Sequence, residues 1–407
     1  MQSIWKAGMA GVAAGLLMLA CGGGSTTTTP TPTAPSETSS KAADLRTSLD
    51  LLLGEHLTLA TKATNAALGG RTDEYTAYGQ EITDNGQKIG DMMGVAFGDS
   101  AKEQFNKIWS AHNGFFVDYT KAVAAKDQAG EDKAVKNLTT QYVPKFTDLI
   151  AGATGLPKDT VQSLTTEHVL GTKKVVDDQA AKNWPAAYSD TRAAYLHMQA
   201  IGDPIAEAMA KKESDKFPGD ASSKAAGFRS TLDMLLQEHL YLATSTTDAA
   251  LAGRNEEVQG ALPAVSANGI DLGNAIGSLY GDSAKDQFNK IWSAHNGFFV
   301  DYTTGVAKKD SAMQDKAVQE LTTQYVPQFS DFITSATGLD KNAVAGLVMN
   351  HVLTTKQVVD DQAAAIAAPG ATSWSKAAED DGTAAHHMQM IGDPLAEAIV
   401  NKLPSKF

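Results

Sequence analysis

The chain contains one long sequence twice. Residues 98–120 (GDSAKEQFNKIWSAHNGFFVDYT) return as residues 281–303 with a single change, Glu103 to Asp286. A repeat of this length constrains the architecture more than any local preference, because both copies must fold into the same kind of unit. The sequence therefore predicts two tandem homologous domains: repeat 1 at residues 41–213, a linker at 214–223 and repeat 2 at 224–407.

Apolar residues recur at helical spacing throughout each copy. In the first segment, Leu45, Leu49, Leu52 and Leu59 fall on one helix face, and Gly69-Gly70 follows at the expected helix end. No segment alternates between apolar and polar residues in the way a half-buried strand requires. Six helical segments per copy predict an all-α fold of two helical bundles.

A shorter period divides each copy into three. Histidines recur every 56 residues: His56, His112 and His168 in repeat 1, and His239, His295 and His351 in repeat 2. Each stands on the first helix of a predicted helix pair. We interpret each copy as three αα-hairpins packed into a six-helix bundle. A solenoid of six equal hairpins is the alternative, although the 71-residue step from His168 to His239 interrupts its rhythm.

The N-terminus is typical of a bacterial lipoprotein. Residues 1–20 predict a signal peptide, with Lys6 followed by an apolar stretch too short to span a membrane. The sequence LMLACG at residues 17–22 resembles the lipobox, with Met18 where leucine is usual, and this resemblance implies lipid attachment at Cys21. Residues 21–40, rich in Gly, Thr and Pro, predict a tether. An ordinary secretory signal is the alternative.

Composition and motifs exclude several functions. The net charge of −13 argues against a nucleic-acid partner, which requires clustered Lys and Arg. Cys21 is the only cysteine, so an intramolecular disulfide, a thiolate metal cage and a CxxCH haem attachment are impossible. The chain also lacks a P-loop and the GxSxG, GxGxxG, HExxH and Glu-x-x-His patterns. We therefore expect a protein that is not an enzyme.

The histidines are the candidate functional residues. Eight of the nine form matched pairs across the copies, and the fourth pair, His197 and His387, is followed in each copy by methionine, Met198 and Met388. Neutral imidazole is the commonest metal ligand, and thioether sulfur suits copper(I) or a haem axial position. The competing interpretation is a core residue that donates to a backbone carbonyl or a carboxylate. Spacing alone leaves open whether the four histidines of a domain converge at one site.

A family resemblance covers most of residues 42–210 and 225–402. It is carried by EHLTLA at residues 55–60, WSAHNGFFVDY at 109–119, EHV at 167–169 and HM at 197–198, with their counterparts in the second copy. The chain resembles a helical domain of secreted and surface-anchored bacterial proteins, some of which are labelled copper amine oxidase. The resemblance implies an extracytoplasmic helical domain without an established activity, and suggests copper as a ligand.

These observations predict a non-enzymatic protein, anchored by lipid outside the cytoplasm at the cell surface or in the periplasm. Its tandem bundles are expected to bind a metal ion or haem through bundle-facing histidines. The alternative is a structural or interaction module of the cell envelope, with core histidines, no ligand and an unidentified envelope partner.

Overall fold

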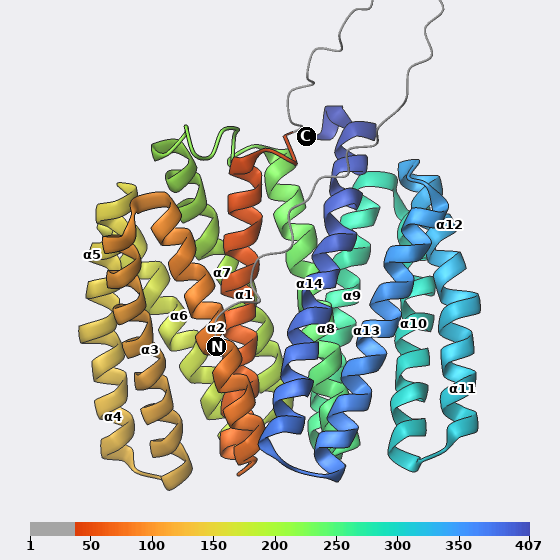
Figure 1. Ribbon diagram of the computed structural model, residues 1–407, viewed down its shortest axis with the longest axis horizontal. Helices are drawn as coiled ribbons and strands as arrows, with labels where there is room; N and C mark the ends of the chain where they lie inside the picture. The colour runs from red at the N-terminus through yellow and green to blue at the C-terminus, as the bar shows by residue number, and fades with distance from the viewer. Residues whose placement is uncertain (1–36) are drawn as a thin grey trace, which may run out of the picture. The chain divides into compact units, whose positions relative to one another are not determined.

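The computed structural model describes residues 37–407, which form helices and no strand, as predicted (Figure 1). The first half comprises α1 (Lys41–Leu68), α2 (Thr72–Phe97), α3 (Asp99–Ala125), α4 (Gln128–Asn137), the π-helix η1 (Leu138–Tyr142), α5 (Val143–Thr154), α6 (Lys158–Ala180) and α7 (Trp184–Lys212). The second half comprises α8 (Lys224–Leu251), α9 (Asn255–Tyr280), α10 (Asp282–Lys308), α11 (Ser311–Glu320), the π-helix η2 (Leu321–Tyr325), α12 (Val326–Thr337), α13 (Lys341–Ala367), α14 (Ala371–Lys402) and the short 3₁₀ turn η3 (Pro404–Lys406).

Local capping sets several helix ends. The Ser40 hydroxyl accepts a hydrogen bond from the Ala43 N–H at 3.2 Å, and Ser223 caps α8 in the same way. Gly98 separates α2 from α3 at a φ of 87°, a conformation that favours glycine. The helix end predicted at Gly69-Gly70 is confirmed, since α1 ends at Leu68.

Each half is a six-helix bundle of three hairpins, when each π-helix and its two flanking helices are counted as one helix. In the first half α1 pairs with α2, α3 with α4 and α5, and α6 with α7, while α1 also packs along α7 and closes the bundle. The aromatic residues of the long repeat lie in the core, where Phe105 stacks on Trp109 with ring centroids 5.0 Å apart. The equivalent cluster around Trp292 fills the core of the second half.

The fourth helix of each half contains a π-helical turn. Both turns have the sequence LTTQY and are followed by Val-Pro, so that Pro144 and Pro327 stand just inside the next α-helix. Proline lacks an N–H and crowds the preceding turn, and a widened turn relieves both problems. The sequence predicts a kink at Pro144; the structure has a π-helix immediately before it.

The two halves pack against each other, and residues 37–407 belong to one compact unit. Helix α1 contacts α8 near the middle of the ribbon (Figure 1), and the flanking contacts repeat, with α7 against α9 and α14 against α2. The predicted linker also contacts the first half, because Ala221 is buried and its carbonyl accepts a hydrogen bond from Arg46 at 2.8 Å. The interface has the self-complementary form of a twofold dimer, built here within one chain.

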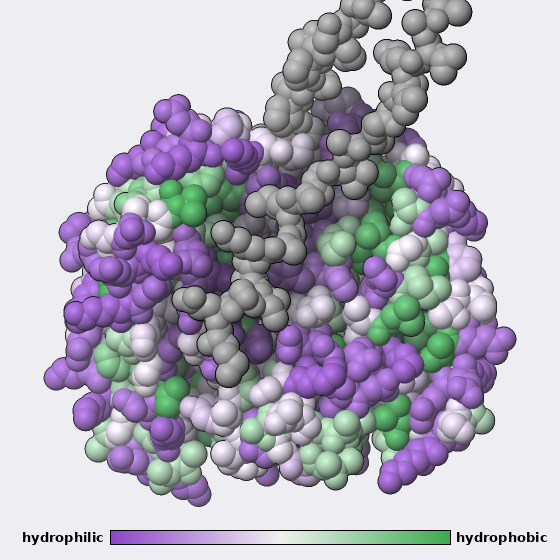
Figure 2. Space-filling model, in the orientation of Figure 1, coloured by the Kyte–Doolittle hydropathy of each residue, from purple (hydrophilic) through white to green (hydrophobic). Residues whose placement is uncertain are grey.

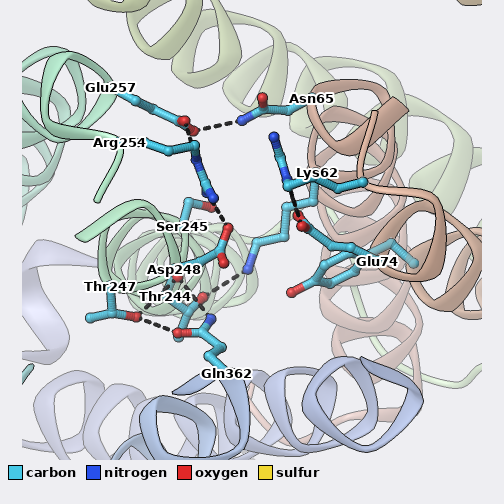
Figure 3. A network of polar contacts seen from close by, with 12 residues as sticks. Lys62, Asn65, Glu74, Thr244, Ser245, Thr247, Asp248, Arg254, Glu257 and Gln362 are labelled. Carbon is cyan, nitrogen blue, oxygen red and sulfur yellow. Dashed lines mark hydrogen bonds and ion pairs between the residues drawn. The ribbon is translucent and has the colours of Figure 1, made fainter. Parts of the chain in front are cut away.

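Charged side chains cross this interface. Lys62 of α1 donates to the Thr244 hydroxyl of α8 at 2.9 Å, and Asn65 donates to Glu257 of α9 at 2.6 Å (Figure 3). Glu74 lies in the same network, where burial and the nearby Asp248 carboxylate raise its pKa to about 7. The interface therefore combines apolar packing with a buried polar network.

Substitution of Gly260 by Ala is expected to destabilise this interface by about 1–3 kcal/mol. A Cβ at Gly260 on α9 would lie 2.7 Å from the backbone carbonyl carbon of Trp184 and 2.9 Å from the Pro185 nitrogen, so α7 and α9 would have to separate. Urea unfolding monitored by circular dichroism measures the loss. Gly79→Ala is the matched control in α2, because its Cβ meets nothing within 4 Å and should stabilise the helix by up to about 1 kcal/mol. Equal effects of the two changes would contradict the close packing.

The surface is mixed in character. Figure 2 shows hydrophilic side chains over much of one face, interrupted by small apolar groups. None of the helices in residues 37–407 combines the length and the apolar character needed to cross a membrane. The predicted signal peptide, the tether up to residue 36 and the lipidation site Cys21 lie outside the described residues.

Candidate metal centre

The bundle brings together three of the four predicted histidines in each half. His56, His112 and His168 stand on α1, α3 and α6, the first helices of the three hairpins. All three are at most 4% exposed, and so are their second-half counterparts. Closure of the three hairpins into one bundle turns these helix faces inward, which is why residues 56 positions apart meet.

The second-half triad is the tighter one. His239, His295 and His351 each offer one ring nitrogen, and these three atoms lie within 4.8 Å of one another. The Nε2 atoms of His295 and His351 are 3.3 Å apart. The ring centroid of His239 lies 5.5 Å from that of His295 and 6.4 Å from that of His351.

The first-half triad has the same arrangement with a looser third member. The Nε2 atoms of His112 and His168 are 3.4 Å apart, close to the distance in the second half. The ring centroid of His56 lies 5.6 Å from that of His112. The paired imidazoles thus have nearly the same separation in both halves. The third histidine, from the first helix of each half, lies beside this pair.

Polar neighbours orient the paired imidazoles. The Nδ1 atom of His112 lies 3.0 Å from the Asn113 side-chain oxygen, and His295 has the same contact with Asn296. When Nδ1 donates this bond, Nε2 keeps its lone pair and faces the neighbouring histidine. On the other side, the Thr355 hydroxyl lies 3.3 Å from Nδ1 of His351.

Aromatic rings complete the walls of each triad. Tyr142, from the π-helix η1, packs on His112 with ring centroids 4.3 Å apart, and Tyr325 of η2 packs on His295 at the same distance. Trp109 contacts His56 at 4.6 Å. The widened turns therefore have a local consequence, because they carry the tyrosine rings that cover the central histidines.

Burial keeps the triad histidines neutral at pH 7. It lowers the pKa of His56, His112 and His239 to about 3 and that of His351 to about 4, and a nearby histidine adds to the effect in each case. The pKa values of His168 and His295 also lie well below the usual value for the same reason. Neutral imidazole is the form that binds a metal ion.

Each triad lies in the wall of a largely apolar pocket. The first pocket has a volume of about 300 Å³, and the second has about 220 Å³. Apart from the histidines, the second pocket is lined mainly by aliphatic and threonine side chains from α8, α9 and α10, among them Leu240, Leu262, Val265, Val300 and Thr304. A small molecule entering this pocket would meet the imidazole nitrogens.

The fourth predicted histidine has a different environment. His197 of α7 is partly exposed, and its Nε2–H donates to the Leu164 carbonyl at 2.9 Å, which occupies that nitrogen. Met198 is buried in the hydrophobic core of the first half, and Met388 in that of the second. His387 is also partly exposed, and it is not part of the triad formed by His239, His295 and His351.

Sequence reasoning missed the residues that support the triads. Asn113 and Asn296 directly follow the central histidines, and Thr172 and Thr355 come four residues after the third histidine of each half. These residues are identical in both copies, which could have indicated a role at the site. The sequence alone did not show this, because duplication preserves neighbouring residues whether or not they have a role.

Comparison with known proteins found no matching family model, no similar curated protein and no similar solved structure. The resemblance to a helical domain of secreted and surface-anchored bacterial proteins therefore stays a prediction.

Proposed function

We propose that each half of this protein binds one transition-metal ion, copper or zinc, through its three buried histidines. The observation that carries the proposal is the separation of the paired Nε2 atoms, 3.4 Å between His112 and His168 and 3.3 Å between His295 and His351. Two nitrogen ligands bound at 2.0–2.1 Å to a tetrahedral ion are roughly 3.3 Å apart. An all-imidazole set suits copper and zinc.

A bare ion fits the site better than haem does. Haem iron takes one or two axial ligands from the protein, whereas three imidazoles approach one another in each half. With three protein ligands, a tetrahedral ion keeps a fourth position. That position would face the apolar pocket and accept water or a small ligand.

The cellular setting belongs to the same proposal. The lipobox at residues 17–22 and the tether at 21–40 support a lipid-anchored protein outside the cytoplasm, with Cys21 as the attachment point. We assign the two metal-binding bundles a non-enzymatic role in binding or carrying the ion, since the chain contains none of the catalytic motifs considered above.

The alternative is an envelope interaction module whose histidines only fill the core. A specific observation favours it: at 3.3 Å, one imidazole N–H of the His295–His351 pair donating to the bare nitrogen of the other would satisfy both rings without an ion. His197 already has such a structural role through its bond to Leu164.

Titration of the chelator-stripped full chain with copper and with zinc, followed by calorimetry and elemental analysis, tests the proposal. We expect uptake of about two ions per chain, and a rise in thermal stability because the ions bind only the folded state. His295→Ala should remove the tighter site and His112→Ala the weaker one. His386→Ala is the matched control, because His386 is exposed and lies outside both triads. Absence of uptake, or uptake unchanged in both triad variants, would leave the histidines as core residues.

A further inference from the structure

The interface between the halves contains the same set of contacts twice, and its two copies have diverged. In the first copy α7 packs against α8 and α9, and in the second α14 packs against α2 and forms an ion pair with α1. The shared sequence aligns α1 with α8 and α2 with α9 at one constant difference in residue number. The seven-residue insertion around Ala367–Ser373 shifts the offset that aligns α7 with α14. Outside the insertion, each residue of these helices therefore has a counterpart in the other copy.

In the first copy an arginine neutralises a buried glutamate. Arg192 of α7 donates from Nε to Oε1 of Glu238 at 2.9 Å and from Nη2 to Oε2 at 3.1 Å. It also donates to Asp271 at 2.8 Å. Glu238 is 2% exposed, and Asn268 donates a further hydrogen bond to it at 2.8 Å. This two-pronged contact is the strong geometry for a guanidinium and a carboxylate.

In the second copy the glutamate remains and the arginine is missing. Glu55, the counterpart of Glu238, is 5% exposed and accepts the equivalent hydrogen bond from Asn85 at 2.8 Å. Gly382 stands where α7 has Arg192, and a Cβ built on it would lie 4.0 Å from Oε1 of Glu55. Among residues 37–407 no lysine or arginine forms an ion pair with Glu55; its other partner is the neutral Tyr241 hydroxyl at 3.3 Å.

A cavity of about 540 Å³ lies beside Glu55, between α2 and α14. Three of its lining residues are more polar than their counterparts in the first copy: Glu81 for Ala264, Glu379 for Ser189, and His386 for Leu196. Burial raises the pKa of Glu81, and the neighbouring carboxylates Asp84, Glu55 and Glu379 add to the rise against an opposing effect of Lys88. The second copy has thus lost the arginine and gained two acids around the space, while Lys88 stands in place of Asp271.

We propose that this cavity binds a small organic cation with a guanidinium or amine head group. The charged head would take the position relative to Glu55 that the Arg192 guanidinium takes relative to Glu238. The volume is within the usual range for small-molecule sites. A second cavity shares Glu55, Lys88, His386 and Gln389 with it and has Leu45, Leu51, Met92 and Phe217 in its walls, which gives room for an apolar extension of the ligand. This site is separate from the histidine triads and does not depend on the metal proposal.

Calorimetric titration of the full chain with agmatine, at low ionic strength, tests the proposal. We expect saturable binding of one agmatine per chain that weakens as salt is added. Urea, a planar neutral analogue of guanidinium, should give no saturable heat at the same millimolar concentrations. Absence of saturable agmatine binding, or equal binding of urea, would overturn the proposal.

Two variants locate the binding. Glu55→Gln keeps the shape of the side chain and removes its charge, so agmatine affinity should fall at least about tenfold. Gly382→Arg supplies the missing guanidinium within the chain, so it should abolish agmatine binding and raise the melting temperature. Unchanged binding in both variants would overturn the proposal.

Glu256→Gln is the matched control. Glu256 is an exposed acid on α9, so this change removes the same charge as Glu55→Gln without altering the cavity. We expect wild-type affinity for agmatine. If Glu256→Gln weakens binding as much as Glu55→Gln does, the ligand is attracted by net charge alone and the cavity is not its site.

Discussion

Acidifying the metal-free protein from pH 7 to pH 4 is expected to unfold it cooperatively. Six triad histidines are buried and neutral. Burial lowers the pKa of His56, His112 and His239 to about 3 and that of His351 to about 4, and it also lowers those of His168 and His295, against about 6.5 in an unfolded chain. Each takes up a proton on unfolding below pH 6.5. The stability that they support is therefore complete above pH 6.5 and is lost as the pH falls.

Buried acids act in the opposite direction. Burial raises the pKa of Glu74 to about 7, places those of Asp50 and Asp233 well above the usual value, and also raises those of Glu238 and Glu81. The folded state keeps these protons where the unfolded chain has released them, so these groups favour folding in acid. Because six imidazoles titrate near pH 6.5 in the unfolded chain, we expect their proton uptake to set the net loss of stability between pH 7 and pH 4.

The measurement is the urea midpoint between pH 8 and pH 4 in the presence of a chelator, monitored by circular dichroism. A typical domain stability of about 5–15 kcal/mol is small enough to be lost over this pH range when several buried imidazoles take up protons on unfolding. His351→Gln, which cannot titrate, should reduce the slope by about one proton. A stability that stays flat between pH 7 and pH 4 would contradict the burial of neutral histidines.

Removing one partner of the Lys62–Asp381 ion pair is expected to cost about 3–5 kcal/mol of stability. Asp381 of α14 is fully buried and Lys62 of α1 is 7% exposed, so either charge left alone would be uncompensated in the interior. Lys62 also donates to Thr244 (Figure 3), and the Tyr78 hydroxyl donates to Asp381 at 3.3 Å. The pair links the two halves directly.

The other copy of the interface shows which uncharged residues can replace this ion pair. At the equivalent place in the other copy of the interface, the counterparts of Lys62 and Asp381 are the uncharged Ser245 and Thr191. Lys62→Ser and Asp381→Thr should each be strongly destabilising, whereas the double variant should cost less than either one. A double-mutant cycle from urea unfolding measures the coupling. Simple addition of the two single effects would show that the pair contributes no interaction energy.

Much of the fold could be predicted because duplication and local chemistry point the same way. The repeat predicted two halves, the histidine spacing predicted three hairpins, and Gly69-Gly70 marked the end of the first helix. The interface between the halves could not be predicted in this way. Lys62 and Glu55 lie on helix faces that look alike in the sequence. The counter-ion of Lys62 comes from α14, more than 300 residues later, and Glu55 accepts a hydrogen bond from Tyr241 of α8.

The residues of the candidate site could be predicted from the sequence, but their geometry could not. His56, His112 and His168 were candidates because they recur on apolar helix faces, but convergence depends on how the hairpins close. His197 also recurs in both copies, but it lies outside the triad. It stands on α7, where its ring donates to the Leu164 carbonyl. The supporting Asn113 and the tyrosine of the π-helix become meaningful only once the histidine rings are positioned.

The diverged interface determines which halves recognise each other. In a pair of first halves, Lys62 would face the neutral Thr191 and remain buried without a counter-charge. In a pair of second halves, Asp381 would face Ser245, and Glu238 would lie opposite Gly382 with no arginine. The pairing of a first half with a second half matches both Lys62 with Asp381 and Arg192 with Glu238. We therefore expect the duplicated bundles to prefer this pairing, and an exchange of halves between two chains would preserve it.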